Sequence, residues 1–225
     1  NSEENFWFKS KNDLIKIFFK KFKKKDLKIL SIGAGTGREL KVLNEFGEVF
    51  VIEINKKALD LISKELCQNK KQGDVQNLPF SKDFFDIVLA SDVLEHVNDD
   101  KKAVNEIQRV LKKEGTFIFT VPAHQFIFSS HDKALGHKKR YSKEELKQLT
   151  KKFKKVEINY WNFFLSPIVI LKRILNKDSK PEVDKITLPK TIDTLFYRIM
   201  SLENGLIARD MHLPFGITLF GICKK

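Results

Sequence analysis

The chain has 225 residues, a length that suits one large α/β domain and excludes two ordinary enzyme domains. Hydrophobic residues make up 42%, with only 10 glycines and 6 prolines, which excludes a disordered or collagen-like chain, and a mean hydropathy of −0.30 excludes a polytopic membrane protein. The net charge of +13 suits a nucleic-acid or anionic-membrane partner, yet nearly all basic residues are lysine and 20 residues are phenylalanine, a bias that A/T-rich coding also produces.

Helices and strands are predicted to alternate along the chain. Residues 13–25 carry apolar side chains at helical spacing, and a short apolar run over 28–32 predicts a buried strand. Strands this apolar are typical of a parallel sheet with helices on both faces. The later expected strands are 49–54, 84–90, 115–121, 155–161 and 215–223, and the helices between them are 38–46, 56–66, 100–111 and 142–153.

This alternation predicts a three-layer, Rossmann-like α/β sandwich. Residues 162–214 are too long for a hairpin loop and carry an apolar helix at 163–175 and an amphipathic helix at 192–206, which we expect to pack together. The predicted parts of a single domain over 1–225 are a helical extension at 1–25, a cofactor-binding core at 26–161, a helical insertion at 162–214 and a last strand at 215–225.

The first strand runs into a glycine-rich turn, Gly33-Ala34-Gly35-Thr36-Gly37. Glycines there let the backbone approach a ligand closely, and the following helix offers free N–H groups. The dinucleotide fingerprint would place its third glycine at Arg38, so the spacing differs from that motif. Glu53 ends the second strand, where it either accepts the two ribose hydroxyls of a nucleoside or is a solvated strand-end acid.

Four blocks in this order resemble the seven-strand S-adenosylmethionine (SAM) dependent methyltransferases. They are the glycine turn, Gly73–Phe80, Phe85–Val97 and Arg109–Thr116. The resemblance implies a seven-strand, mostly parallel sheet with an antiparallel last strand, with SAM as cofactor and S-adenosylhomocysteine as product. It also implies that Asp74 bonds the adenine amino group. The implied cofactor-binding residues are Ser31, Gly33, Ala34, Gly35, Gly37, Glu53, Ile54, Asp74, Val75 and Ser91.

One position departs from the family pattern. The family places an acid two residues before the first glycine, where it helps to hold the methionine end of SAM, and this chain has Ser31. Serine keeps a hydrogen bond but loses the charge. The methionine end is therefore expected to bind less tightly or to use another acid, and an inactive relative is an alternative.

The residues after two strands bear on the acceptor. Ala90-Ser91-Asp92 differs from the Asn/Asp-Pro-Pro-aromatic motif of enzymes that methylate nucleobase amines. Val121-Pro122-Ala123 lacks the cysteine whose thiolate attacks the base in enzymes that methylate carbon 5 of cytosine. An RNA or DNA methyltransferase is therefore the second hypothesis. A third is a non-catalytic module on a degenerate methyltransferase fold that binds a membrane surface or a partner.

Three of the five histidines fall in the segment after the fifth strand, where open α/β sheets bind ligands. The segment is similar to a bacterial and archaeal methyltransferase subgroup with a His-Asp and Gly-His-x-x-Arg-Tyr signature, and this resemblance implies cell-envelope saccharides or related molecules as acceptors. Glu4–Phe8 and Leu213–Gly216 also resemble that subgroup. The expected catalytic residues are His131, the favoured base, with His96 and Asp132, and the expected acceptor-binding residues are His124, His137, Arg140 and Tyr141.

Structural roles remain open for the same residues. An interaction between His131 and Asp132 could instead hold the conformation of the loop. His137, Arg140 and Tyr141 could instead cap the helix that begins at Ser142. The spacing of His124, His131, Asp132 and His137 fits no standard zinc pattern, so no metal is expected.

The apolar helix at 163–175 is far shorter than the ~20 residues that span a bilayer, and its last turn contains Lys172 and Arg173. It suits an anionic membrane surface or a lipid-linked acceptor, or alternatively a lid or a dimer face. With two cysteines, we expect a cytoplasmic protein that can lie against the inner face of the membrane; the oligomeric state is not predicted. The favoured function is O-methylation of a small-molecule, saccharide or lipid-linked acceptor.

Overall fold

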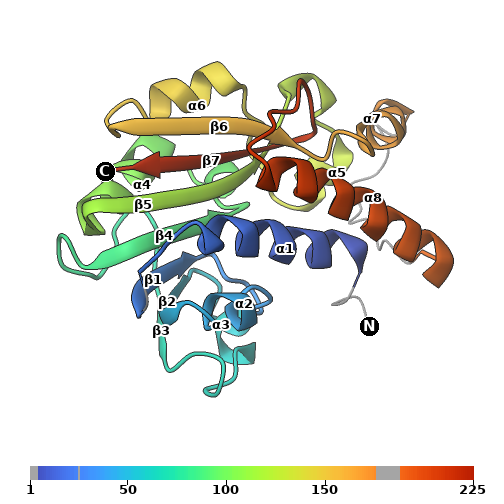
Figure 1. Ribbon diagram of the computed structural model, residues 1–225. Helices are drawn as coiled ribbons and strands as arrows, with labels where there is room; N and C mark the ends of the chain where they lie inside the picture. The colour runs from blue at the N-terminus through green and yellow to red at the C-terminus, as the bar shows by residue number, and fades with distance from the viewer. Residues whose placement is uncertain (1–4, 25, 176–187) are drawn as a thin grey trace.

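The computed structural model describes residues 5–24, 26–175 and 188–225. Its centre is a seven-stranded sheet in the order β3-β2-β1-β4-β5-β7-β6 (Figure 1). β7 runs antiparallel to both β5 and β6, and the other pairs are parallel, as expected for the fold class. The strands are β1 Leu27–Ile32, β2 Gly47–Glu53, β3 Asn69–Gln72, β4 Phe85–Ser91, β5 Leu111–Pro122, β6 Lys155–Trp161 and β7 Thr218–Lys224.

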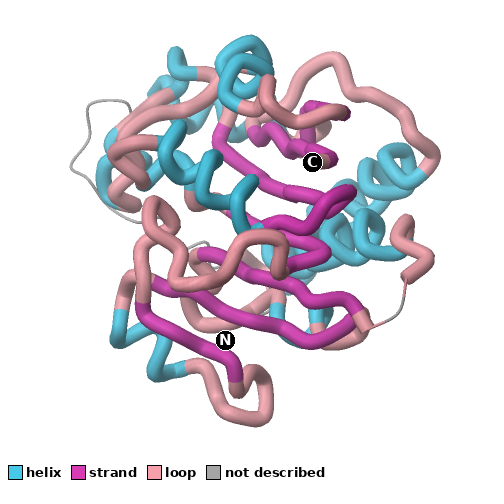
Figure 2. The backbone as a smooth tube through the Cα atoms, turned by 90° about the vertical axis from the view of Figure 1, so that its left-hand side faces the viewer, coloured by secondary structure: helices cyan, strands magenta, loops and turns pink. Residues whose placement is uncertain are grey.

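Helices cover both faces of the sheet, and Figure 2 shows them on either side of the strands. Alternate residues of a strand point to opposite faces, so Ile29 packs into one buried cluster with α1 and α8, and Leu30 into another with α4 and α6. This confirms the predicted sandwich. The helices are α1 Phe6–Lys20, α2 Leu40–Leu43, α3 Lys56–Leu61, α4 Asp100–Val110, α5 Ser130–Ala134, α6 Lys143–Leu149, α7 Ser166–Leu175 and α8 Lys190–Ala208, with 3-10 turns η2 Leu94–His96 and η3 Gln125–Ile127.

Several element boundaries differ from the prediction. α1 begins at Phe6, seven residues early, because the side chain of Asn5 accepts a hydrogen bond from the Phe8 N–H and caps the helix. β3 was not predicted, since this edge strand has the sequence Asn-Lys-Lys-Gln and, among the described strands, pairs with β2 alone. An edge strand that buries little side-chain surface carries no apolar pattern to find.

The insertion packs differently from the prediction. The amphipathic helix, expected to pack on the apolar helix, packs along α1 in the structure: the rings of Phe6 and Phe196 lie 5.3 Å apart, and Tyr197 donates to Asp13 at 2.9 Å. Figure 1 shows α1 and α8 side by side across one face of the sheet. The sheet offers both helices one apolar surface, which explains the pairing. Residues 176–187 of the predicted insertion, and residues 1–4 and 25 of the predicted extension, lie outside the described residues.

α7 keeps an exposed apolar surface. Ile168, Leu171 and Ile174 are 58%, 60% and 57% exposed. Arg173, one of the two cations expected at a membrane, donates to the Ser129 hydroxyl at 3.2 Å. In the part of the chain that the structure describes, no helix combines the length and the apolar character needed to cross a bilayer.

Candidate cofactor and acceptor site

The glycine turn after β1 is held in a conformation that favours glycine. Gly33, Gly35 and Gly37 have φ values of +66°, +55° and +82°. A Cβ atom on Gly33 would lie 2.6 Å from Cγ2 of Val93, whereas a Cβ on Gly35 would meet no atom within 4 Å. The Gly35 side of the turn therefore faces open space, where a ligand can approach the backbone.

Glu53 stands at the carboxyl end of β2 beside this turn. Its Oε2 accepts from the Gly35 N–H at 2.9 Å and its Oε1 from the Asn55 N–H at 2.8 Å. The residue is 6% exposed, so it is not a solvated strand-end acid. Each carboxylate oxygen retains a second acceptor site, which fits the two hydroxyls of a ribose. Ile54, the next residue, is 67% exposed and offers an apolar surface.

Asp74 occupies the segment that follows β3, next to Glu53. The Gly73 N–H donates to the Glu53 carbonyl at 3.2 Å, which joins the two segments. Asp74 Oδ1 accepts from the Gln76 N–H at 2.8 Å, and Oδ2 accepts from the Gln76 side-chain amide at 2.9 Å. Val75 is 5% exposed and packs into the core. These bonds fix the orientation of the Asp74 carboxylate.

A second acid lies beside Ser31, the residue that departs from the family pattern. The Ser31 hydroxyl donates to Glu39 Oε1 at 2.9 Å. Burial raises the pKa of Glu39, against the lowering effects of its backbone bond, of Ser31 and of the Lys11 charge. Lys11, on α1, forms an ion pair with Asp92 just after β4. Glu39 and Lys11 were not predicted; Lys11 precedes residue 13, where the helix was expected to begin.

Asp132 organises the segment between β5 and α6. It is fully buried, and its Oδ1 accepts from His137 Nδ1 at 2.9 Å and from Arg140 Nε at 3.0 Å. Burial raises the pKa of the Asp132 carboxyl, but the His137 hydrogen bond and the Arg140 charge outweigh it and hold that pKa well below its usual range. Its Oδ2 accepts from the Ser129 N–H at 2.9 Å. Asp132 thus orients His137 and Arg140.

Arg140 and Tyr141, expected to bind the acceptor, are 5% and 1% exposed. Arg140 Nη1 donates to the Ala123 carbonyl at 3.1 Å, and the Tyr141 hydroxyl donates to the Leu94 carbonyl at 2.9 Å. Both residues direct polar groups toward the protein interior and tie the segment to the ends of β4 and β5. The cap of α6 comes from Ser142 and Glu145, which form the predicted capping box.

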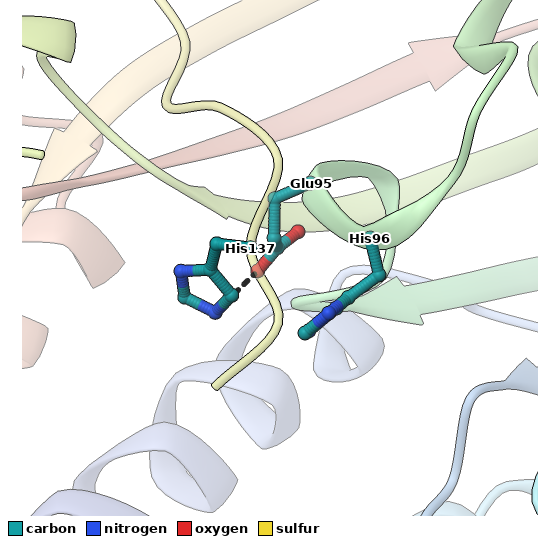
Figure 3. Close-up of side chains that lie close together, drawn as sticks. All are labelled: Glu95, His96 and His137. Atoms are coloured by element: carbon teal, nitrogen blue, oxygen red, sulfur yellow. Dashed lines mark ion pairs between the residues drawn. The ribbon is translucent and has the colours of Figure 1, made fainter. Parts of the chain in front are cut away.

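Three side chains converge in front of β4 and β5, and in Figure 3 the Glu95 carboxylate lies between two imidazoles. Its Oε1 is 3.9 Å from His137 Nε2, and the rings of His96 and His137 lie 4.8 Å apart. Burial, followed by the charge of Asp92, raises the pKa of Glu95 well above its usual value. Burial also lowers the pKa of His96. Glu95 was not predicted, because a polar turn gives no sign that its acid is buried.

The remaining candidates lie in separate surroundings. The His124 ring stacks on Phe215 at 4.4 Å and its Nε2 donates to the Gly216 carbonyl at 3.0 Å. Burial lowers the pKa of His124, which favours its neutral form. His131 is half-buried on α5. The Ser91 and Thr120 hydroxyls, at the ends of β4 and β5, are 3.2 Å apart.

Known proteins resemble parts of this chain in sequence and nearly all of it in fold. Residues 30–119 match the methyltransferase domain family. An uncharacterized protein of Methanocaldococcus jannaschii is 38% identical over 110 residues, which cover 48% of this chain and 46% of that protein. A demethylmenaquinone methyltransferase of Lactobacillus johnsonii is 36% identical over 118 residues, covering 47% of this chain and 48% of that protein. The matches thus span about half the length of these relatives.

Solved structures resemble almost the whole chain. A possible histamine N-methyltransferase of Thermotoga maritima has a TM-score of 0.61 at 18% identity, with 95% of this chain and 89% of that chain covered. A Haemonchus contortus phosphoethanolamine N-methyltransferase in complex with SAM has a TM-score of 0.63 at 20% identity, with 95% and 52% covered.

Residues 30–119 thus resemble the methyltransferase domain family in sequence, and the chain has the Rossmann-like fold of solved SAM-dependent methyltransferases. SAM is the cofactor of this class. The open face at Gly35 and the free acceptor sites on Glu53 fit such a cofactor.

Proposed function

We propose that the chain is a SAM-dependent methyltransferase that methylates an oxygen of a small-molecule, saccharide or lipid-linked acceptor. One observation carries the proposal. The open glycine turn at Gly35, with Glu53 beside it, lies at the same edge of the sheet as the polar cluster of Glu95, His96 and His137. In parallel α/β sheets, the carboxyl ends of the strands bind the ligand.

The geometry around the glycine turn supports the proposed cofactor roles. In the proposal the glycine turn presents backbone N–H groups, Glu53 accepts the ribose hydroxyls and Asp74 meets the adenine amino group. Ile54 supplies the exposed apolar surface beside the base. The methionine end meets the cluster around Ser31, where the Glu39 carboxylate replaces the usual acid.

The proposed roles of the residues near the acceptor come from what methyl transfer to an oxygen requires. Methyl transfer from a sulfonium is an in-line displacement, so holding the two reactants together supplies most of the catalysis. An oxygen acceptor must also lose its proton, for which His131 and His96 are the proposed bases. Asp132 is a positioning residue that acts through His137. His124, Arg140 and Tyr141 shape the wall of the acceptor site.

A lipid-linked acceptor draws support from the apolar surface next to this segment. Phe126 is 60% exposed in η3, which contacts α7, and Leu171 on α7 is 60% exposed. The same surface favours a second candidate, C-methylation of a lipophilic ring. The Lactobacillus johnsonii relative is a demethylmenaquinone methyltransferase, which gives that candidate a precedent among the matched sequences.

The experiment that separates these candidates follows the methyl group. The protein is incubated with SAM carrying a carbon-13 methyl and with three probes: a methyl glycoside, a lipid-linked saccharide and demethylmenaquinone. Carbon-13 NMR distinguishes a methoxy carbon from a ring methyl carbon. A methoxy product on either saccharide is expected; a ring methyl product on the quinone, or no transfer to any probe, contradicts the proposal.

A further inference from the structure

Glu95, His96 and His137 direct a carboxylate and two imidazoles toward one point. One ligand-type atom from each residue lies within 4.8 Å of the other two (Figure 3). Glu95 and His96 come from the turn after β4, and His137 comes from the segment after α5. Two distant parts of the chain therefore build one cluster of metal-ligating groups.

Hydrogen bonds orient both imidazoles. His137 Nδ1 lies 2.9 Å from Asp132 Oδ1, and His96 Nδ1 lies 3.2 Å from the Gly136 carbonyl. Both partners are acceptors, so each Nδ1 donates and each Nε2 is the nitrogen left to face an ion. A carboxylate or carbonyl behind a ligating imidazole is the usual arrangement around protein-bound metals.

Glu95 lacks the hydrogen bonds that a buried acid needs, and the ion-pair contact of its Oε1 with His137 Nε2 is as long as 3.9 Å. It is fully buried, and neither of its carboxylate oxygens has a hydrogen-bond partner among the residues that the structure describes. Leaving such a group unpaired costs several kcal/mol, so buried carboxylates are as a rule paired or bound to metal. Of the nearby cations, Lys11 pairs with Asp92, and Arg140 pairs with Asp132.

We propose that Glu95, His96 and His137 bind one divalent transition-metal ion, of the Zn²⁺ or Mn²⁺ type. Two imidazoles and one carboxylate suit these ions. Ligand atoms that share an ion at about 2.1 Å lie roughly 3 to 3.5 Å apart, so the cluster closes by about 1 Å on binding. Three protein ligands leave coordination positions open for the acceptor. The prediction of no metal considered only residues of the histidine-rich segment, which supplies one of the three ligands.

The catalytic part of this inference rests on the proposed function. An acceptor hydroxyl bound to the ion has a lowered pKa and releases its proton to His131, the favoured base, or to water; His96, as a ligand of the ion, does not then serve as a base. The resulting oxyanion attacks the methyl carbon of the sulfonium. The carbon–oxygen bond forms as the carbon–sulfur bond breaks, and its electron pair leaves with S-adenosylhomocysteine.

Calorimetry tests the site without any turnover. The full chain is stripped with a chelator and titrated with Zn²⁺ and, separately, with Mn²⁺. The native protein is expected to bind one ion, and the Glu95→Gln and His137→Gln variants to lose more than about 100-fold in affinity, because loss of an outer-shell partner alone costs up to about that much. His212→Ala is the matched control, because His212 bonds Asn159 on β6 and not this cluster. Equal affinity of the native and Glu95→Gln proteins would overturn the site.

Two further readouts separate folding and catalysis from binding. The stripped Glu95→Gln protein is expected to unfold at or above the native temperature, because an amide replaces an unpaired buried acid, and Zn²⁺ is expected to stabilise only the native protein. An equal Zn²⁺ stabilisation of both proteins would overturn the site. Methyl transfer by the stripped enzyme at the native rate would overturn the catalytic role. Failure of the native protein to bind S-adenosylhomocysteine contradicts the proposed function instead, and leaves the metal titration valid.

Discussion

Replacement of Gly33 by alanine tests the geometry of the glycine turn. The φ of +66° forces an alanine into the left-handed region, which costs about 1 kcal/mol. The new Cβ would also lie 2.6 Å from Cγ2 of Val93, and overpacking of this kind costs about 1 to 3 kcal/mol. We therefore expect Gly33→Ala to lower the free energy of unfolding by about 2 to 4 kcal/mol.

Gly35→Ala is the matched control. Its φ of +55° gives a similar backbone strain, but its Cβ meets nothing within 4 Å, so we expect a loss of only about 1 kcal/mol. Val93→Ala provides the rescue. It removes the clashing Cγ2 and leaves Cβ of Val93 at 3.7 Å, an ordinary contact, so the cost of Gly33→Ala in this background falls to about 1 kcal/mol.

Urea unfolding of the native protein, the three single variants and the Gly33→Ala/Val93→Ala double variant measures these differences. The reasoning is refuted if Gly33→Ala and Gly35→Ala destabilise the protein equally. It also fails if the cost of Gly33→Ala is unchanged in the Val93→Ala background.

Three further predictions concern stability and binding. Burial raises the pKa of Asp86, but hydrogen bonds from Lys112 and Lys24 outweigh it and lower that pKa from 3.8 to about 2. The stabilisation is therefore present above about pH 4 and lost as the pH falls toward 2. Because solvent screens the partly exposed lysines, we expect Asp86→Asn to lower the free energy of unfolding by about 1 kcal/mol at pH 7. The free energy of unfolding of the variant should also depend less on pH between about 4 and 2; the same pH dependence in both proteins would contradict this. Tyr141→Phe removes a buried donor to the Leu94 carbonyl, and we expect thermal unfolding to show a free energy of unfolding lower by about 1 to 3 kcal/mol. An unchanged free energy of unfolding would indicate that the hydroxyl bonds water instead. If the chain acts on small acceptors, its affinity for RNA or DNA will be weak and similar at all sequences; tight, sequence-selective binding with a steep salt dependence would favour the nucleic-acid hypothesis.

The layered fold could be predicted because its interior strands are apolar on both faces. β1 and β4 have such sequences, and the structure contains both. The edge strand β3 buries little side-chain surface, and its sequence gives no corresponding signal. The capping interaction of Asn5 likewise depends on one side chain rather than on a periodic pattern.

The candidate site could be predicted in part. The glycine turn and Glu53 were found because their roles depend on local sequence and strand position. Glu39, Lys11 and Glu95 were missed, because their significance arises from side-chain contacts with Ser31, Asp92 and His137 and not from a local sequence pattern.

The expectation that His131 acts together with Asp132 was based on their adjacency in the sequence, and adjacency does not reveal contacts made across a turn. Asp132 bonds His137, five residues later, because the chain turns back through Gly136 with a φ of +76°. No spacing rule identifies which imidazole a carboxylate will meet across such a turn.

Calorimetry with S-adenosylhomocysteine tests the central claim most directly, that the edge of the sheet around Gly35, Glu53 and Asp74 binds the cofactor. The account predicts saturable binding at one site per chain, weakened at least about tenfold in Glu53→Ala and in Asp74→Ala. Asp60→Ala, which removes an exposed acid paired with Lys56 on α3, should bind as the native protein does. No binding by the native protein, or undiminished binding by Glu53→Ala, would contradict the account.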